Sequence, residues 1–167
     1  MKKLYIARHA KSDWPVGVLT DFDRPLNERG RNDAALMSNF LRSNRLIPDM
    51  ILASPAVRAL TTARIMASEP SGNVKTPLIT VDMLYMTDVW HTLKVISTID
   101  DALRSAMIVG HNPTQTLLVN YLTNEMIDSV PTCGIVIAEF PQADSWQEIS
   151  RSTGVLTAFY TPNNFNK

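Results

Sequence analysis

The chain has 167 residues, of which 45% are hydrophobic, so its length and composition predict a single domain over residues 1–167 with an ordinary packed core. Sixteen basic and sixteen acidic residues cancel to a net charge of zero at pH 7, which argues against nucleic acid or an anionic membrane as the main partner. No apolar run approaches the roughly 18 to 20 residues that cross a bilayer, and we expect a cytoplasmic protein that is a monomer by default.

The first elements in the chain are a buried strand, a long loop and an amphipathic helix. The apolar run 4–7 predicts the strand. Residues 11–25 are polar and contain Trp, Pro and Gly, which favours an ordered loop, and long loops in compact domains tend to be functional. Asn27 is a suitable cap for a helix that should end near Asn44.

A second strand and helix follow directly. Residues 49–53 predict the strand, and Ser54 with Pro55 predicts the start of the helix, because serine caps well and proline loses no hydrogen bond at the first helical position. Arg58 then falls in the first turn. The helix should stop before the breaker cluster at 69–73.

The rest of the chain continues to alternate between strands and helices. The expected strands are 78–81, 106–109, 135–138 and 155–160, and the expected helices are 89–103 and 114–122. This alternation predicts an α/β fold, a three-layer α/β/α sandwich with a mostly parallel central sheet and an antiparallel strand near the end.

Cationic and imidazole side chains follow the predicted strands. Arg8 and His9 come directly after the first strand, and His111 has the same setting after the strand at 106–109. Arg58 lies at a helix N-terminus, where free N–H groups already favour an anion. In a doubly wound sheet, ligands bind outside the carboxyl ends of the strands. The sequence therefore predicts that these groups meet around a phosphoryl group.

The pattern as a whole resembles the histidine phosphatase (phosphoglycerate mutase-like) superfamily, and within it the bacterial phosphohistidine phosphatase, SixA-like branch. The resemblance extends over most of the chain, with alanine replacing the glycine of the family's Arg-His-Gly opening. Four segments carry it: Arg8-His9-Ala10-Lys11-Ser12-Asp13-Trp14, Leu26-Asn27-Glu28-Arg29-Gly30, Ser54-Pro55-Ala56-Val57-Arg58-Ala59 with Thr62-Ala63, and Val109-Gly110-His111-Asn112-Pro113.

The resemblance implies a phosphatase in which His9 is transiently phosphorylated while Arg8, Arg58 and His111 bind the phosphoryl oxygens. A neutral imidazole is a competent nucleophile, and paired guanidinium donors can stabilise the charge of the transferred group without a metal or another cofactor. Further phosphate-binding candidates lie beside these residues: Lys11, Ser12 and Asn112.

Two departures from the family pattern bear on the substrate. Pro15 stands where ester-cleaving members carry an asparagine, so one phosphate contact is either lost or replaced by Lys11, Ser12 or a backbone N–H. Those members also carry an acidic general acid after the third strand, where this chain offers Asp82 and Asp88 as candidates. We favour a strand end and a helix cap for these two aspartates. The imidazole of phosphohistidine leaves more easily than an alkoxide, so a missing acid favours an N–P substrate on a phosphorylated protein over a small phosphate ester.

Other interpretations fit the sequence less well. Asp21 and Asp23 resemble the paired aspartates of haloacid dehalogenase-type phosphatases but follow no long apolar strand. A cysteine-dependent phosphatase would need an arginine six places after the lone Cys133, where Glu139 stands, and we expect this cysteine to be a buried apolar residue. His91, on a predicted helix, is expected at the surface. A general phosphomonoesterase and a module that binds phosphate without turnover remain as alternatives.

Overall fold

The computed structural model describes residues 1–68 and 75–165, and strands in these ranges form one six-stranded sheet. The strand order is β3-β2-β4-β1-β5-β6. β5 is antiparallel to both of its neighbours, whereas β3, β2, β4 and β1 pair in parallel. The strands are β1 (Lys2–Arg8), β2 (Met50–Ala53), β3 (Leu78–Thr80), β4 (Ser105–Gly110), β5 (Ile135–Phe140) and β6 (Val155–Tyr160).

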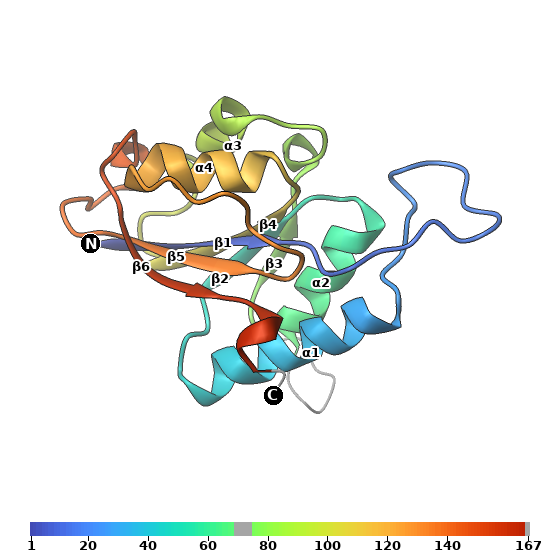
Figure 1. Ribbon diagram of the computed structural model, residues 1–167. Coiled ribbons are helices and arrows are strands. Elements are labelled where there is room, and N and C mark those ends of the chain that lie inside the picture. The colour runs from blue at the N-terminus through green and yellow to red at the C-terminus, as the bar shows by residue number, and fades with distance from the viewer. Residues whose placement is uncertain (69–74, 166–167) are drawn as a thin grey trace.

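Helices cover both faces of this sheet, so the predicted three-layer sandwich is confirmed (Figure 1). Leu4 and Ile6 pack with α3 and α4 on one face, and the alternate residues Tyr5 and Ala7 pack with α1 and α2 on the other, as the two-residue period of a strand requires. The helices are α1 (Glu28–Ser43), α2 (Val57–Ala67), α3 (Val89–Ile96) and α4 (Thr114–Thr123). No helix of the described ranges is long and apolar enough to cross a membrane.

The boundaries of α1 are those that the sequence predicts. The side chain of Asn27 accepts a hydrogen bond of 2.8 Å from the backbone N–H of Gly30, and Asn44 is the C-terminal cap. The loop 11–25 precedes this helix and extends away from the sheet on the side where β1 ends (Figure 1). One isolated bridge, between Ser12 and Leu26, closes the base of the loop.

The predicted start of α2 is wrong by two residues. The helix begins at Val57, and its N-terminal cap is Ala56, whose side chain makes no capping bond. The hydroxyl of Ser54 lies 2.8 Å from Nε2 of His111. The side chain that the sequence predicts as the helix cap is therefore hydrogen-bonded to a histidine that is distant in the sequence. Arg58 is nevertheless in the first turn, as predicted. The breaker cluster 69–73 lies outside the described residues.

The predicted helix 89–103 is too long, because α3 ends at Ile96. The following residues form turns, and the carbonyl groups of Asp101 and Leu103 accept hydrogen bonds of 2.7 and 3.0 Å from the ammonium group of Lys2. Trp146 also donates its indole N–H to the carbonyl of Leu103, at 3.1 Å. The carbonyl groups of Asp101 and Leu103 thus bond to distant side chains, whereas a longer helix would be held by hydrogen bonds between residues four positions apart.

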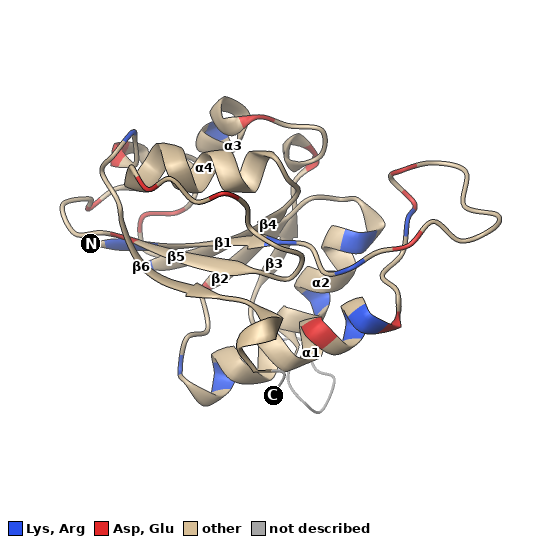
Figure 2. Ribbon diagram, in the orientation of Figure 1, with Lys and Arg blue, Asp and Glu red and all other residues tan. Residues whose placement is uncertain are grey.

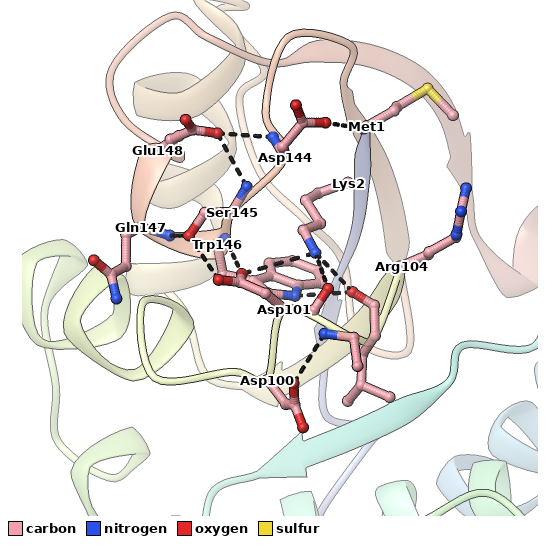
Figure 3. A network of polar contacts seen from close by, with 12 residues as sticks. Met1, Lys2, Asp100, Asp101, Arg104, Asp144, Ser145, Trp146, Gln147 and Glu148 are labelled. Carbon is pink, nitrogen blue, oxygen red and sulfur yellow. Dashed lines mark hydrogen bonds and ion pairs between the residues drawn. The ribbon is translucent and has the colours of Figure 1, made fainter.

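The Lys2 network fixes the amino end of β1 (Figure 3). Lys2 is only 3% exposed, and its ammonium group lies 5.4 Å from the centre of the Trp146 ring. A buried ammonium group is stable only when its donors are satisfied, and here backbone carbonyls and an aromatic face surround it. One end of the central strand is therefore anchored structurally, and the opposite end carries the candidate site.

Candidate active site

A polar cleft of about 420 Å³ opens at the carboxyl ends of β1 and β4, beside the first turn of α2. Basic residues, drawn in blue in Figure 2, mark the end of β1 and the start of α2 on the side of the extended loop. The cleft is lined by Arg8, His9, Lys11, Ser12, Asp21, Arg24, Arg58, Tyr85, Met86, His111, Asn112 and Thr132. The four residues that the sequence expects around a phosphoryl group thus meet in one cavity.

His9 is held in a fixed orientation where β1 ends. Its backbone N–H donates to the carbonyl of Gly110 at 3.0 Å, which ties it to the end of β4. The ring atom Nδ1 lies 2.7 Å from the carbonyl oxygen of Ala10, so Nδ1 carries the proton and donates it. In the described part of the chain Nε2 has no hydrogen-bond partner, and its lone pair is free for a ligand in the cleft.

The surroundings of His9 keep its ring uncharged. Burial lowers the pKa of His9 to about 3, and the positive charges of Arg58 and Arg8 act in the same direction. The side chain is 9% exposed, so water solvates an imidazolium poorly there. At neutral pH His9 is therefore a neutral imidazole with an available nitrogen, which is the form that acts as a nucleophile.

His111 faces His9 across the cleft, with the ring centres 5.1 Å apart. Its Nε2 lies 2.8 Å from the hydroxyl of Ser54, and that hydroxyl also accepts the backbone N–H of Ala56 at 3.4 Å. The Ser54 hydroxyl, which accepts from Ala56, can donate its own proton to Nε2, and this arrangement places the ring proton of His111 on Nδ1. Burial first, and then the charge of Arg58, lowers the pKa of His111 to about 4.

Arg8 and Arg58 are each anchored by part of the guanidinium group only. Arg8 donates one Nη1–H to the carbonyl of Val130 at 3.1 Å, and both terminal nitrogens of Arg58 donate to Asp21. Among the described residues, four buried side-chain polar atoms lack a partner, and three belong to this site: Arg8 Nε, Arg58 Nε and His111 Nδ1. Buried polar atoms are normally satisfied, and the three side chains that carry these unpaired nitrogens all line the cleft, which suits an anionic ligand there.

The other predicted phosphate-binding residues also line the cleft, but two of them have protein partners. The Ser12 hydroxyl accepts a hydrogen bond of 3.1 Å from Arg24. The Asn112 amide donates to the carbonyl of Val130 at 2.9 Å, and its oxygen accepts from Thr116 at 3.0 Å. Lys11 is exposed at the mouth of the cleft. Pro15, which stands in place of the family's asparagine, is exposed and does not line the cleft.

The two general-acid candidates lie outside the residues that line the cleft. Asp82 is the first residue of the 3-10 helix η1 (Asp82–Leu84), two residues after the end of β3. Asp88 caps α3: its carboxylate accepts the backbone N–H of His91 at 2.9 Å, and bonds from His91 lower its pKa. His91 is exposed, as the sequence predicts. The aspartates have the strand-end and helix-cap positions that the sequence analysis favoured.

Sequence reasoning missed four residues that support the site. Asp21, Arg24 and Tyr85 line the cleft, although the first two lie in the irregular loop and Tyr85 follows η1. Gln115, at the start of α4, is 1% exposed and donates hydrogen bonds to the carbonyls of Ala7 at 2.8 Å and of Ile108 at 3.1 Å. A buried amide in a helix and a carboxylate in an arginine-containing loop give no periodic signal by which they could have been found.

The arrangement combines a neutral nucleophile with cationic donors and offers no carboxylic acid. Asp21 is the one carboxyl group among the described residues that line the cleft. Burial by itself would raise its pKa, but hydrogen bonds from Arg58 and Arg24 outweigh this and lower it to about 2. It is ionised at neutral pH and holds no proton to give. The cleft can therefore bind a phosphoryl group and attack it, but it cannot protonate a leaving group from a carboxyl.

Comparisons with known proteins agree with this geometry. Residues 4–84 match the family model described as "Histidine phosphatase superfamily (branch 1)". An uncharacterized protein of Mycobacterium leprae (strain TN) is 30% identical over 167 residues, which covers 93% of this chain and 99% of the relative.

Solved structures match over nearly the whole chain. A protein described as "putative phosphohistidine phosphatase SixA from Agrobacterium tumefaciens" is 26% identical, with a TM-score of 0.78 over 96% of this chain and 99% of that one. The protein histidine phosphatase SixA complexed with tungstate is 20% identical, with a TM-score of 0.80 over 98% and 99% of the two chains.

Proposed function

Because this chain belongs to the histidine phosphatase superfamily, in its SixA-like branch, we propose that it removes phosphoryl groups from phosphohistidine on a protein, with His9 as the transient acceptor. The observation that carries the proposal is the set of unpaired donors, Arg8 Nε, Arg58 Nε and His111 Nδ1, around a neutral His9 ring. A tetrahedral phosphoryl group supplies the oxygen acceptors that these nitrogens lack.

In the first step Nε2 of His9 attacks phosphorus, and the bond between phosphorus and the substrate nitrogen breaks. The electron pair of that bond leaves with the substrate imidazole, whose other ring nitrogen takes up a proton from solvent. Arg8 and Arg58 bind the equatorial oxygens, where charge accumulates in phosphoryl transfer. The bond from Nδ1 of His9 to Ala10 holds the ring in line for the attack.

In the second step water attacks the phosphorus of phosphorylated His9, and the N–P bond breaks to release inorganic phosphate. The proton of the water leaves with the phosphate, and His9 returns to its neutral form. His111 donates its Nδ1–H to a phosphoryl oxygen in both steps. A negative phosphoryl group raises the proton affinity of a nearby imidazole, so the pKa of His111 rises when the substrate binds.

The absence of a carboxylic acid from the described lining of the cleft favours an N–P bond as the substrate. An alkoxide needs a proton to leave, and a positioned acid contributes about 100- to 10,000-fold in rate. A phosphohistidine ring whose other nitrogen takes a proton from solvent releases neutral imidazole, whose conjugate acid has an ordinary pKa of about 6.5, so no acid of the protein is needed. The names of the similar structures support this assignment, and the tungstate complex supports binding of a tetrahedral oxyanion on this fold.

A trapping experiment tests the role of His9. Brief incubation with a phosphorylated substrate followed by rapid quench should leave phosphate on His9, in a linkage that is labile to acid and stable to base. His9→Asn should abolish both label and turnover, because asparagine keeps a donor for the Ala10 carbonyl but has no nucleophilic nitrogen. His91→Ala, at the exposed histidine of α3, is the control and should retain both. Near-normal turnover by His9→Asn would disprove the mechanism.

A comparison of substrates tests the preference for the N–P bond. Turnover efficiency on a phosphohistidine-bearing protein domain is measured against aryl, sugar and phosphoserine esters at matched pH, and the phosphohistidine domain should be preferred. A preference for an ester, with loss of that activity in Asp82→Asn or Asp88→Asn, would instead identify a general acid and a general phosphomonoesterase. Binding of phosphate with no turnover of any substrate would identify a recognition module.

A further inference from the structure

The carboxylate of Asp21 receives hydrogen bonds from three different segments of the chain. Its Oδ2 accepts from Nη2 of Arg58 at 2.9 Å and from the hydroxyl of Tyr85 at 3.1 Å. Its Oδ1 accepts from Nη1 of Arg24 at 3.0 Å. These donors come from α2, from the segment that follows η1 and from the loop itself. The carboxylate is therefore held in one orientation, although the side chain is 43% exposed.

Asp21 holds the two terminal nitrogens of the Arg58 guanidinium group, Nη1 and Nη2, in place. Nη1 of Arg58 donates to the backbone carbonyl of Asp21 at 2.5 Å, and Nη2 donates to its carboxylate. A guanidinium group is planar, so two fixed terminal nitrogens also fix the direction of the Nε–H bond. That Nε–H is buried, has no protein partner, and belongs to a side chain that lines the cleft.

We propose that Asp21 is a positioning residue for phosphoryl transfer. It accepts hydrogen bonds from both terminal nitrogens of Arg58 and so orients the Nε–H of that arginine toward the phosphoryl group. This inference rests on the proposed function. A long arginine side chain otherwise samples many rotamers, and phosphoryl transfer depends on donors placed before the reaction begins. Asp21 itself does not touch the transferred group. It acts through Arg58.

A second consequence follows from the negative charge of Asp21. Arg8, Arg24, Arg58 and Lys11 line the cleft, and Asp21 is the one anion among the described lining residues. A carboxylate bound to Arg58 weakens the attraction of the cleft for phosphate in the ground state, which favours release of the product. Loss of Asp21 should therefore slow the transfer and tighten phosphate binding, whereas general damage to the site would weaken both.

Two substitutions of Asp21 distinguish its role as a hydrogen-bond acceptor for Arg58 from the effect of its negative charge. Asp21→Ala removes both, and we expect kcat to fall by about 10- to 100-fold, the scale for a catalytic donor displaced by about 1 Å. Asp21→Asn keeps one oxygen that can accept from Arg58 and should recover part of the lost kcat. Both variants should bind inorganic phosphate several-fold more tightly in calorimetric titrations. Asp23→Ala is the control, because Asp23 is in the same loop but its carboxylate accepts from Thr20 and does not line the cleft.

A spectroscopic readout makes the test independent of turnover. The Nε–H signal of Arg58 is followed by nitrogen-15 NMR during titration with inorganic phosphate. In the wild type and in Asp23→Ala this signal should shift on binding, since phosphate accepts from the fixed Nε–H. In Asp21→Ala the shift should be smaller and the signal broader, because the guanidinium group samples several orientations.

The possible outcomes distinguish this inference from the proposed function. If wild-type His9 is not labelled by substrate but the phosphate-induced Arg58 shift is lost in Asp21→Ala, the proposed function fails and Asp21 still positions an anion-binding arginine. If His9 is labelled and Asp21→Ala keeps kcat within twofold with an unchanged Arg58 signal, the positioning role is disproved. A parallel loss of kcat and phosphate affinity would also overturn it, since that is the signature of a damaged fold.

Discussion

At the scale of single residues, the buried His9 and the half-buried His111 make the stability of the protein depend on pH. The pKa values of His9 and His111 are lowered to about 3 and about 4, mainly by burial, whereas both are near 6.5 in the unfolded chain. Between about pH 6.5 and 4 the unfolded chain therefore binds protons that the folded chain excludes. The free energy of unfolding is then highest above pH 6.5 and falls as the pH decreases through this window.

Urea denaturation at pH 7, 6 and 5 measures this dependence. The two histidines together contribute a slope of up to about 2.7 kcal/mol per pH unit below pH 6. The double variant His9→Asn/His111→Asn should lose most of that slope, while His91→Ala, at an exposed site, should keep it. Equal slopes in the wild type and the double variant would show that the two rings are not held neutral by the fold.

Arg58 allows a direct test of the cationic donors. Arg58→Ala should reduce turnover by about 100- to 1,000-fold, the scale for removal of one preorganised donor to a developing negative charge. Arg64→Ala changes the same helix at an exposed position two turns on and should leave turnover within twofold. Turnover is measured with a phosphohistidine domain at saturating concentration. A similar loss in both variants would point to damage of α2 instead of loss of a phosphate contact.

At the scale of elements, the first turn of α1 supports the loop that forms one wall of the cleft. A Cβ atom added at Gly30 would overlap the carbonyl oxygen of Lys11, and a backbone atom cannot move away as the end of a flexible side chain does. The same carbonyl accepts the N–H of Asn27 at 3.1 Å, so the helix start and the loop are in direct contact. Glycine is required here by close approach of two backbones.

Gly30→Ala should therefore destabilise the protein even though alanine is the better helix former. We expect a loss of roughly 1–3 kcal/mol from overpacking, measured by urea denaturation, together with reduced turnover because Lys11 and Ser12 are displaced. Asn32→Ala, at an exposed position of the same helix, should be neutral or slightly stabilising. An unchanged midpoint for Gly30→Ala would mean that the loop moves freely away from α1.

At the scale of the whole molecule, the cleft concentrates fixed cations where other phosphoryl-transfer sites use a metal ion. Arg8, Arg24 and Arg58 line it, and no group of three or more His, Cys, Asp or Glu residues within the described ranges could hold a metal. We predict that a chelator leaves turnover intact and that vanadate, which mimics a five-coordinate phosphoryl group, inhibits competitively. Dependence of turnover on added magnesium would contradict the prediction.

The topology of the sheet explains how residues far apart in the sequence reach this cleft. β4 lies between β1 and β2, so the end of β4 places His111 between His9 and Ser54. β5 runs antiparallel to β1, so Thr132, in the segment that enters β5, also lines the cleft, and the carbonyl of Val130 in the same segment accepts from Arg8. A mostly parallel sheet thus gathers these four segments at a single edge.

Several features of this protein follow from local chemistry that can be read directly in the sequence. The strand period and the caps of α1 placed the elements, and the strand ends delivered Arg8, His9 and His111 to one edge of the sheet. Arg58 was placed correctly although α2 begins two residues later than predicted, because one helical turn contains both positions. These signals are read within a few residues and need no knowledge of the rest of the chain.

The partners of the polar groups, by contrast, depend on how the whole chain folds. Ser54 is a suitable helix cap by its chemistry, yet its hydroxyl bonds to a histidine 57 positions away. The apolar spacing after α3 is typical of a helix, yet the backbone carbonyls there accept hydrogen bonds from Lys2 and the helix does not continue. Asp21 meets Arg58 across 37 positions. Such bonds depend on the strand order and on how a loop returns to the sheet, and local propensity encodes neither of these. The catalytic candidates could therefore be predicted from the sequence, whereas the residues that orient them could not.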